Sequence, residues 1–233
     1  MAEHISKQYD SELETLRSGV LQMGGLVESQ IRSAIEAFST GSRELIEKVI
    51  AAEERVDQHE VDIDNICSHV IVKRQPAAGD LRLIMAIMRA VTDLERIGDE
   101  AEKIARMSGQ IHERGRTQLM SSGAIRHAAD IAISMLRHAL DALARLDARD
   151  AAKVIREDAA IDDEFRSIVR QLITFMMEDP RTISTALEIV WIAKAVARIG
   201  DHAKNIAEDV IYIVKGTDIR HTRFVELEGD GPR

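Results

Sequence analysis

The chain has 233 residues, a formal net charge of −9 and only 3% aromatic residues. Phosphate contacts to a nucleic acid need a basic face, and the basic residues here are interspersed with acids, so a nucleic-acid binder is not expected. The three prolines and the abundance of Ala, Leu, Ile, Glu, Arg and Met favour helices over sheets, and the sequence predicts an all-α protein.

The apolar segments of this sequence are interrupted by charges. The range 183–199, for example, contains Glu188 and Lys194, so it lacks the roughly 20 consecutive apolar residues that span a bilayer. The first residues lack the apolar core of a signal peptide. The single cysteine, Cys67, has no partner for an internal disulfide and lies among aliphatic residues. We therefore expect a cytoplasmic protein in which Cys67 is a core residue.

The first two helices are predicted over about 6–39 and 42–74. In the first of them, apolar residues recur at steps of three and four, as in the helices of a bundle. The pair Gly24-Gly25 inside it predicts a kink or a close contact with another helix. Ser42 is the predicted N-cap of the second helix.

A turn at residues 75–80 separates the second helix from a third. It contains a proline, a glycine and a predicted capping acid, Asp80, which it delivers to the N-terminus of a helix that runs to about residue 113. Further helices are predicted from about 124 to a turn at 147–150, from there to a turn at 177–180, and from about 182 to 214, where Gly216 is the expected left-handed C-cap.

One sequence motif occurs twice. The segment RIGDEAEKIA at 96–105 reappears as RIGDHAKNIA at 198–207, about one hundred residues later, which indicates a duplicated bundle rather than a solenoid. Short connections make neighbouring helices antiparallel. We expect six long helices that form two tandem three-helix bundles, residues 1–115 and 116–216, related by an approximate twofold axis and followed by a polar tail, residues 217–233.

Acidic residues spaced by four recur in both copies, and this spacing places them on nearly the same face of a helix. Carboxylate and amide oxygens suit hard cations such as Mg²⁺, Mn²⁺ or Fe³⁺. The pairs of the second and fifth helices occupy equivalent places in the two copies. The candidate metal ligands are Glu53, Asp57, Glu95, Asp99, Asp158, Asp162, Asp201, Asn205 and Glu208.

A solvated acidic face is the alternative interpretation of these acids, because long charged helices contain such pairs by chance. The two copies also differ. Glu95 corresponds to Ala197, and the positions of Asn205 and Glu208 are basic in the first copy. The sites are therefore expected to be unequal, or one of them to be lost.

The other residues of the repeated motif have structural interpretations. Arg96 and Arg198 lie beside carboxylates and predict ion pairs, whereas Gly98 and Gly200 predict close packing between helices. His202 is a possible metal ligand, although a surface histidine is more often only a polar residue.

Sequence signatures of enzymes are scarce. We find no Walker-type phosphate loop, no G-x-S-x-G and no H-E-x-x-H. No histidine has a glutamate three residues before it, which argues against a di-iron bundle enzyme. Trp191 and the methionines recur at helical spacing, which indicates a core or a partner-binding groove rather than a cofactor site.

Four segments resemble the signatures of the PhoU family. They are RQPAAGDLR at 74–82, TDLERIGD at 92–99, MMEDPR at 176–181 and RIGDHAKNIAED at 198–209, and the resemblance extends over residues 5–221. It implies a cytoplasmic, usually dimeric, six-helix protein without catalytic activity. Such a protein would link the phosphate ABC transporter, through its ATPase PstB, to the sensor histidine kinase PhoR, and would repress the phosphate-starvation response when phosphate is plentiful.

Members of this family carry acid-x-x-x-Asp motifs that bind metal, in some cases as iron or zinc clusters. The resemblance places these motifs at Glu53/Asp57, Glu95/Asp99, Asp158/Asp162 and Asp201, with a departure at Ala197.

A non-enzymatic adaptor whose acidic faces are shaped by Mg, Mn, Fe or Zn is therefore our main hypothesis. Its rivals are a carboxylate-metal enzyme or metal-storage bundle that uses the same acids, and a purely structural dimerisation bundle.

Overall fold

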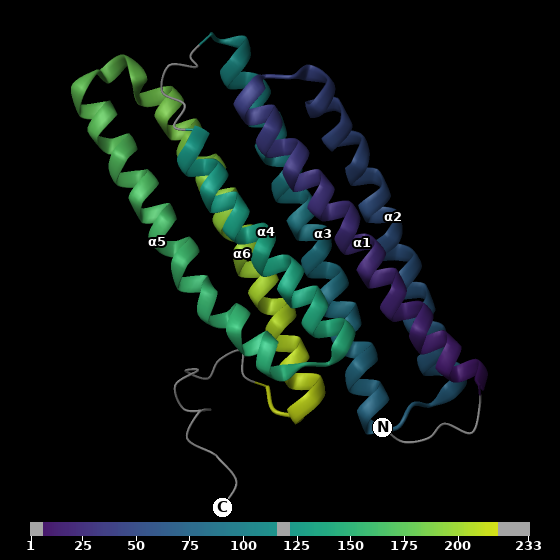
Figure 1. The fold of residues 1–233 in the computed structure, drawn as a ribbon. Coiled ribbons are helices and arrows are strands. Elements are labelled where there is room, and N and C mark those ends of the chain that lie inside the picture. The colour runs from purple at the N-terminus through teal and green to yellow at the C-terminus, as the bar shows by residue number, and fades with distance from the viewer. Residues whose placement is uncertain (1–6, 116–121, 219–233) are drawn as a thin grey trace, which may run out of the picture.

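The computed structural model describes residues 7–115 and 122–218, and these residues form six long helices and one 3₁₀ turn, with no strand among them (Figure 1). The all-α prediction is therefore confirmed. The predicted helices agree with the observed ones to within about three residues at each end. The elements are α1 (Lys7–Thr40), α2 (Arg43–Arg74), α3 (Ala78–Glu113), α4 (Ser122–Arg145), α5 (Ala148–Glu178), η2 (Pro180–Thr182) and α6 (Ile183–Lys215).

Local capping explains most of these boundaries. The Ser42 side chain accepts a hydrogen bond from the backbone N–H of Leu45, as an N-cap does, and Gly216 ends α6 in the left-handed conformation with φ 73°. The expectation for Asp80 needs a correction. The N-cap of α3 is Ala77, and Asp80 lies in the first turn of the helix, where its carboxylate accepts a hydrogen bond from the Tyr9 hydroxyl.

Two three-helix groups make up the molecule. Helices α1, α2 and α3 pack on one another, as do α4, α5 and α6, and the groups meet where α3 packs on α6 and α1 on α4. Both pairs are antiparallel, as the ribbon shows (Figure 1). Residues that pair across them run in opposite order, for example Arg89 with Asp209 and Glu100 with Arg198. An approximate twofold axis perpendicular to the helices therefore relates the two groups. The division of the sequence at residues 115 and 116 stays a prediction.

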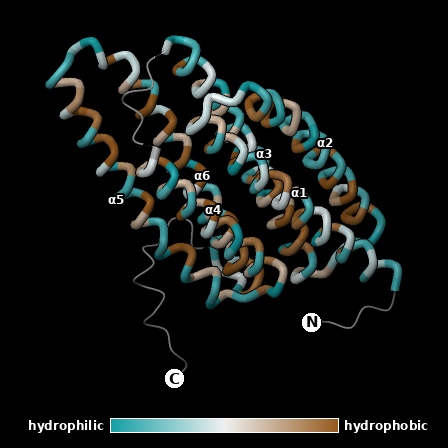
Figure 2. The backbone as a smooth tube through the Cα atoms, turned by 45° about the horizontal axis from the view of Figure 1, so that its top comes forward, coloured by the Kyte–Doolittle hydropathy of each residue, from teal (hydrophilic) through white to brown (hydrophobic). Residues whose placement is uncertain are grey.

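The core extends without a break through both groups. Hydrophobic and hydrophilic residues alternate in short segments along each helix, so that one stripe of every helix faces its neighbours (Figure 2). Cys67 is fully buried, as predicted. At Gly24 the two groups approach closely, since a Cβ added there would lie 2.4 Å from Cδ1 of Leu140 in α4. The glycine pair thus marks a close helix contact.

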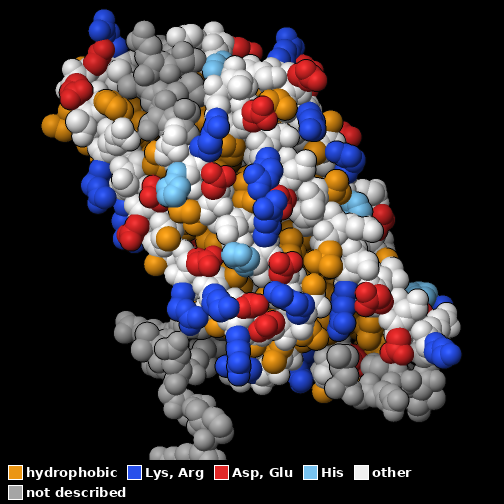
Figure 3. Space-filling view, viewed as in Figure 1, with side chains coloured by type: hydrophobic (Ala, Val, Ile, Leu, Met, Phe, Trp, Pro, Cys, Tyr) orange, Lys and Arg blue, Asp and Glu red, His pale blue; other side chains and the backbone are white. Residues whose placement is uncertain are grey.

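The described surface is highly charged. Acidic and basic side chains are interspersed over the face shown in Figure 3 rather than separated into two fields. None of the described helices has the length and apolarity needed to cross a membrane. Trp191 is 61% exposed and therefore does not belong to the core. Most of the predicted polar tail, from residue 219 onward, lies outside the described residues.

Candidate functional site: two acidic clusters and a groove

The first acidic cluster lies where α2 packs on α3. Glu53 is buried and only 8% exposed, Glu95 is half-buried, and Asp57 and Asp99 are exposed. Burial raises the pKa of Glu53 to about 7, and the charges of Asp99 and Asp57 add to this effect. Burial and the charge of Asp99 likewise raise the pKa of Glu95. The structure therefore brings together the four acids that the sequence predicted for the first copy.

Glu53 is held at the inner end of this cluster by two neighbours. The side-chain amide of Gln30 in α1 donates a hydrogen bond to Oε2 of Glu53, whereas Oε1 of Glu53 is buried and has no hydrogen-bond partner among the described residues. Gly98 makes room for the carboxylate, because a Cβ at this position would lie 2.9 Å from Oε2. The predicted role of Gly98 in close packing is confirmed, and its neighbour is a carboxylate.

Sequence reasoning missed two further acids of this cluster. Glu60 lies one turn beyond Asp57, and the hydroxyl of Thr92 donates a hydrogen bond to it at 3.3 Å. Glu102 contributes its charge to both Glu53 and Asp99. The spacing already contained a signal for Glu60, since it continues the stripe of acids along α2 at a step of three.

The second acidic cluster lies where α5 packs on α6, and it contains its own cations. Asp201 is exposed, and the charges of Asp158 and Asp162 act on it. Lys204 donates a hydrogen bond to Oδ2 of Asp158 at 2.7 Å. Partial burial of its carboxyl raises the pKa of Asp201, and the positive charge of Lys194 opposes this shift without reversing it.

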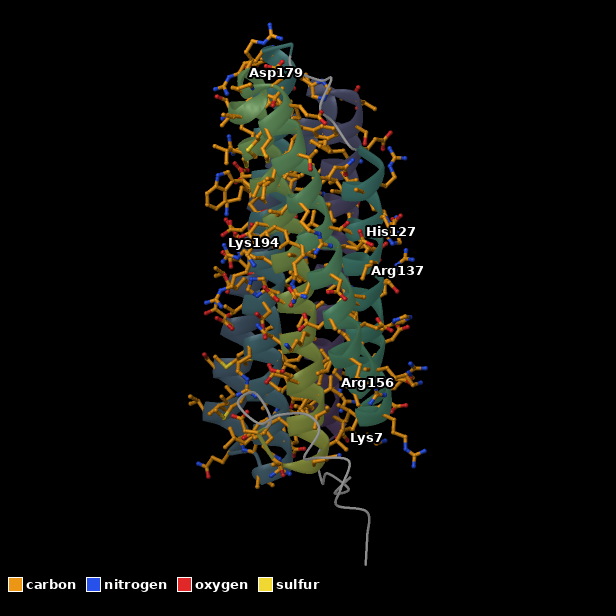
Figure 4. All side chains as sticks on the ribbon, turned by 90° about the vertical axis from the view of Figure 1, so that its left-hand side faces the viewer. Lys7, His127, Arg137, Arg156, Asp179 and Lys194 are labelled. Carbon is orange, nitrogen blue, oxygen red and sulfur yellow. The ribbon has the colours of Figure 1, made fainter. Side chains whose placement is uncertain are left out.

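Lys194 lies near the middle of the bundle, on the side opposite His127 and Arg137 of α4, while Asp179 marks the end that carries the α5–α6 turn (Figure 4). The ammonium group of Lys194 lies 5.5 Å from the centre of the Phe165 ring.

Asn205 and Glu208 do not complete the cluster of Asp201. The amide of Asn205 donates a hydrogen bond to Asp93 of α3 at 3.1 Å. Glu208 is buried, and although its charge acts on Lys204, it lines a groove between α3 and α6. Asn205 and Glu208 do lie at the predicted helical steps from Asp201. Their neighbours, however, are Asp93 and the groove rather than the acids around Asp201.

This groove between α3 and α6 has a volume of about 510 Å³ and a lining of mixed charge. Arg89 pairs with Asp209 at 2.7 Å and lies 5.0 Å from the centre of the Tyr212 ring. The groove is lined by Asp64, Met88, Arg89, Thr92, Asp93, Arg96, Asn205, Glu208 and Asp209.

A buried polar contact beside this groove joins the two halves. His202 is only 8% exposed, and its Nδ1 lies 2.8 Å from Oδ1 of Asp93. The interpretation of His202 as a surface residue is therefore wrong. Arg198 pairs with Glu100 at 2.8 Å, which confirms the ion pair predicted for this arginine.

The carboxylates fit a hydrated cation better than a dehydrated metal site. Within residues 7–115 and 122–218, no three His, Cys, Asp or Glu side chains lie close enough together to hold a metal ion. Mg²⁺ keeps several of its waters and is commonly bound through one or two carboxylates. In the first cluster, the oxygen that would be free to bind such a cation is the buried Oε1 of Glu53, which accepts no hydrogen bond from the residues that the structure describes.

Fold and site define a class of helical protein that is built from two copies of a three-helix unit, each with an acidic face. The sequence profile described as the PhoU domain matches residues 20–108 and again residues 125–210, and the chain belongs to the PhoU family.

Relatives and solved structures agree with this assignment. Over 221 residues, 95% of this chain and 86% of the relative, the chain is 48% identical to the "Phosphate-specific transport system accessory protein PhoU homolog" of Pseudomonas putida. It is 44% identical to the "Phosphate-specific transport system accessory protein PhoU" of Escherichia coli K12. This match extends over 229 residues and covers 97% of this chain and 92% of the relative. The crystal structure of PhoU from Pseudomonas aeruginosa superimposes with a TM-score of 0.86 at 45% identity, covering 90% of this chain and 100% of that one. The PhoU structure from Streptococcus pneumoniae gives 0.83 at 26% identity, covering 90% and 98%.

Proposed function

We propose that this protein is an accessory protein of a phosphate-specific transport system and that it acts by binding rather than by catalysis. The observation that carries this proposal is the identity of 44–48% with proteins of that name, which extends over both copies of the repeated unit. The relatives are named accessory proteins rather than enzymes, which supports a regulatory role without chemistry.

In its finer form, the proposal gives the protein two partners on the cytoplasmic side. It would dock on the transporter ATPase PstB and on the sensor histidine kinase PhoR, as a homodimer, and would repress the phosphate-starvation response when phosphate is plentiful. The resemblance of the four signature segments is the basis for these partners.

An apolar stripe supports docking through a helix face. Ile183, Leu187 and Trp191 lie at steps of four along α6 and are all exposed, and Ile173 and Met177 of α5 are exposed near the same end of the molecule. Exposed aromatic and aliphatic side chains of this kind are typical anchors of protein interfaces. We propose that this stripe contacts a partner.

We also propose that a hard cation, Mg, Mn or Fe, with Zn less well matched to the oxygen ligands, helps to order an acidic face. Its ligands would come from the carboxylates described above. When bound, the cation would supply positive charge that relieves the mutual repulsion of these carboxylates.

Co-purification tests the proposed function. The tagged full-length chain should retain the transporter ATPase and the kinase when phosphate is abundant, and a strain that lacks the chain should express a phosphate-starvation reporter constitutively. Leu187→Glu combined with Trp191→Glu should reduce retention of at least one partner. Val72→Glu is the matched control, because Val72 is 77% exposed on α2, away from the α6 stripe. Retention of neither partner by the wild type, together with normal reporter repression without it, would refute the proposal.

A further inference from the structure

The α6 stripe of Ile183, Leu187 and Trp191 continues into a row of cations. Lys194 and Arg198 follow Trp191 at steps of three and four, so they lie on the same side of the helix. The side chain of Arg198 is 47% exposed, and Lys194 lies near the middle of the bundle (Figure 4). The outer face of α6 is therefore apolar near the α5–α6 turn and basic farther along the helix.

Helix α5 carries the same order of residues beside it. Its exposed residues recur at steps of four, three and four, and they are Arg166, Arg170, Ile173 and Met177. Because a short turn joins α5 to α6, the apolar residues of both helices lie near that turn and the cations of both lie farther from it. Arg166 lies 3.7 Å from Asp162, whose charge acts on Asp201, so this row borders the outer face of α6.

The acids of this region do not neutralise its cations. Glu100 of α3 is shared between two of them, since it pairs with Lys103 at 3.3 Å and with Arg198 at 2.8 Å. Arg170 forms no ion pair with any residue in the described part of the chain. Glu188, which lies between Leu187 and Trp191 in the sequence, is already paired with Arg114. Positive charge therefore remains beside the α6 stripe, although the whole chain is acidic.

The equivalent surface of the first copy has a different character. Gly98 corresponds to Gly200, and in the same register Trp191 corresponds to Arg89. Arg89 lines the groove between α3 and α6, where it is occupied by Asp209 and the Tyr212 ring. Lys194 corresponds to Thr92. The exposed aromatic side chain and the lysine that follows it are therefore features of the second copy.

We propose that this outer face of α5 and α6 binds an acidic amphipathic helix of a partner protein. The apolar side of that helix would cover the α6 stripe, and carboxylates at its flank would face Arg170, Lys194 and Arg198. Two adjacent helices present ridges and grooves into which a third helix can pack. This inference rests on the proposed function, because it names the chemistry of the partner that the α6 stripe contacts.

Trp191 can report binding at this face directly, because it is the only tryptophan of the chain. The probe is a synthetic helical peptide without tryptophan that carries leucine at the a and d positions of each heptad and glutamate at the flanking positions. Titrated into the full-length protein, it should shift the emission of Trp191 to shorter wavelength and reduce quenching by acrylamide. A matched peptide with lysine in place of every glutamate should have this effect only at about tenfold higher concentration or more.

Charge reversal tests the role of the cations. Arg170→Glu combined with Lys194→Glu should weaken binding of the acidic peptide by about tenfold or more, and added salt should weaken binding to the wild type. Arg43→Glu combined with Lys48→Glu is the matched control, because both residues are exposed on α2. This control should bind like the wild type. If the first double variant does not fold, as judged by circular dichroism, Arg170→Glu alone should still weaken binding by about threefold or more.

Three results would overturn the inference. They are equal effects of the two peptides on Trp191, no effect of the acidic peptide at about 1 mM, and unchanged binding by the charge-reversed variants. A shift of the emission caused by higher protein concentration alone, or by vesicles of phosphatidylglycerol, in place of the peptide effect would instead assign this face to a second copy of the chain or to a membrane. A wild type that ignores the peptide but still co-purifies with the transporter ATPase would leave the proposed accessory function intact.

Discussion

Glu53 should make the stability of this protein fall as the pH rises through neutrality. Its folded-state pKa of about 7 lies above the ordinary value of 4.5, chiefly because the carboxyl is buried beside other acids. The folded protein therefore binds the proton of Glu53 more tightly than the unfolded chain does. The resulting stabilisation is fully present below about pH 4.5 and is lost as the pH rises through about 7.

The magnitude follows from these two pKa values. A difference of about 2.5 pH units at about 1.36 kcal/mol per unit gives an upper limit of roughly 3 kcal/mol. Water at the outer edge of the cluster screens part of this, so we expect about 1–2 kcal/mol. Glu60, Glu95 and Asp99 also have raised pKa values and add in the same direction.

Urea unfolding at pH 5 and pH 8, in the presence of a chelator, measures this effect. Glu53→Gln should reduce the loss of stability between the two pH values by about 1–2 kcal/mol. It should also be more stable than the wild type at pH 8, because a glutamine can both donate to and accept from Gln30. Glu54→Gln is the control, since Glu54 is an exposed neighbour on α2. Equal pH dependence in Glu53→Gln and the wild type would show that Glu53 is not the group responsible.

Three further predictions concern packing and burial. Gly25→Ala should stabilise α1 by about 0.5–1 kcal/mol, because no described atom lies within 4 Å of the added Cβ. Gly24→Ala should be less stable than Gly25→Ala by about 1–3 kcal/mol through its contact with Leu140, and chemical denaturation of both variants measures the difference. Asp93→Ala and His202→Ala should each lower the free energy of unfolding by about 3 kcal/mol, because each leaves the other side chain buried without its partner. A double-mutant cycle should give a coupling energy of more than about 1 kcal/mol. Additive losses of stability would contradict a direct contact between the two side chains. Cys67 is fully buried and burial raises its pKa to about 12, so the native protein should resist a thiol reagent that labels the urea-unfolded chain at once.

The helices could be predicted from the sequence because their signals are local. Ser42, Gly216 and the proline turns end or begin helices through bonds that span only a few residues. The duplication was equally accessible, since the repeated segment at 198–207 needs no knowledge of contacts. Asp80 shows the limit of this reasoning. An acid near a helix start suits either the cap or the first turn, and the Tyr9 hydroxyl that donates to Asp80 in the first turn lies 71 positions away in the sequence.

The side-chain contacts of the sites were harder to predict from the sequence, because they depend on which stripe of residues on one helix packs against which neighbouring helix. Helix spacing groups Asn205 and Glu208 with Asp201, but the angular position of α6 turns Asn205 toward Asp93 of α3. The same rotation buries His202 against Asp93, which lies 109 positions away in the sequence. Contacts between residues more than a hundred positions apart have no local signature.

The two motif glycines show how duplication can preserve a scaffold while its chemistry diverges. Both are buried, and a Cβ at either would crowd a side chain of the adjacent helix in its own half. For Gly98 that side chain is the carboxylate of Glu53, whereas for Gly200 it is Ile161, whose Cδ1 would lie 2.8 Å away. The glycine is therefore required by the close approach of two helices, whichever group fills the space beside it. A strong repeat in the sequence thus identifies shared packing, and only the residues facing the repeat distinguish a carboxylate site from an apolar contact.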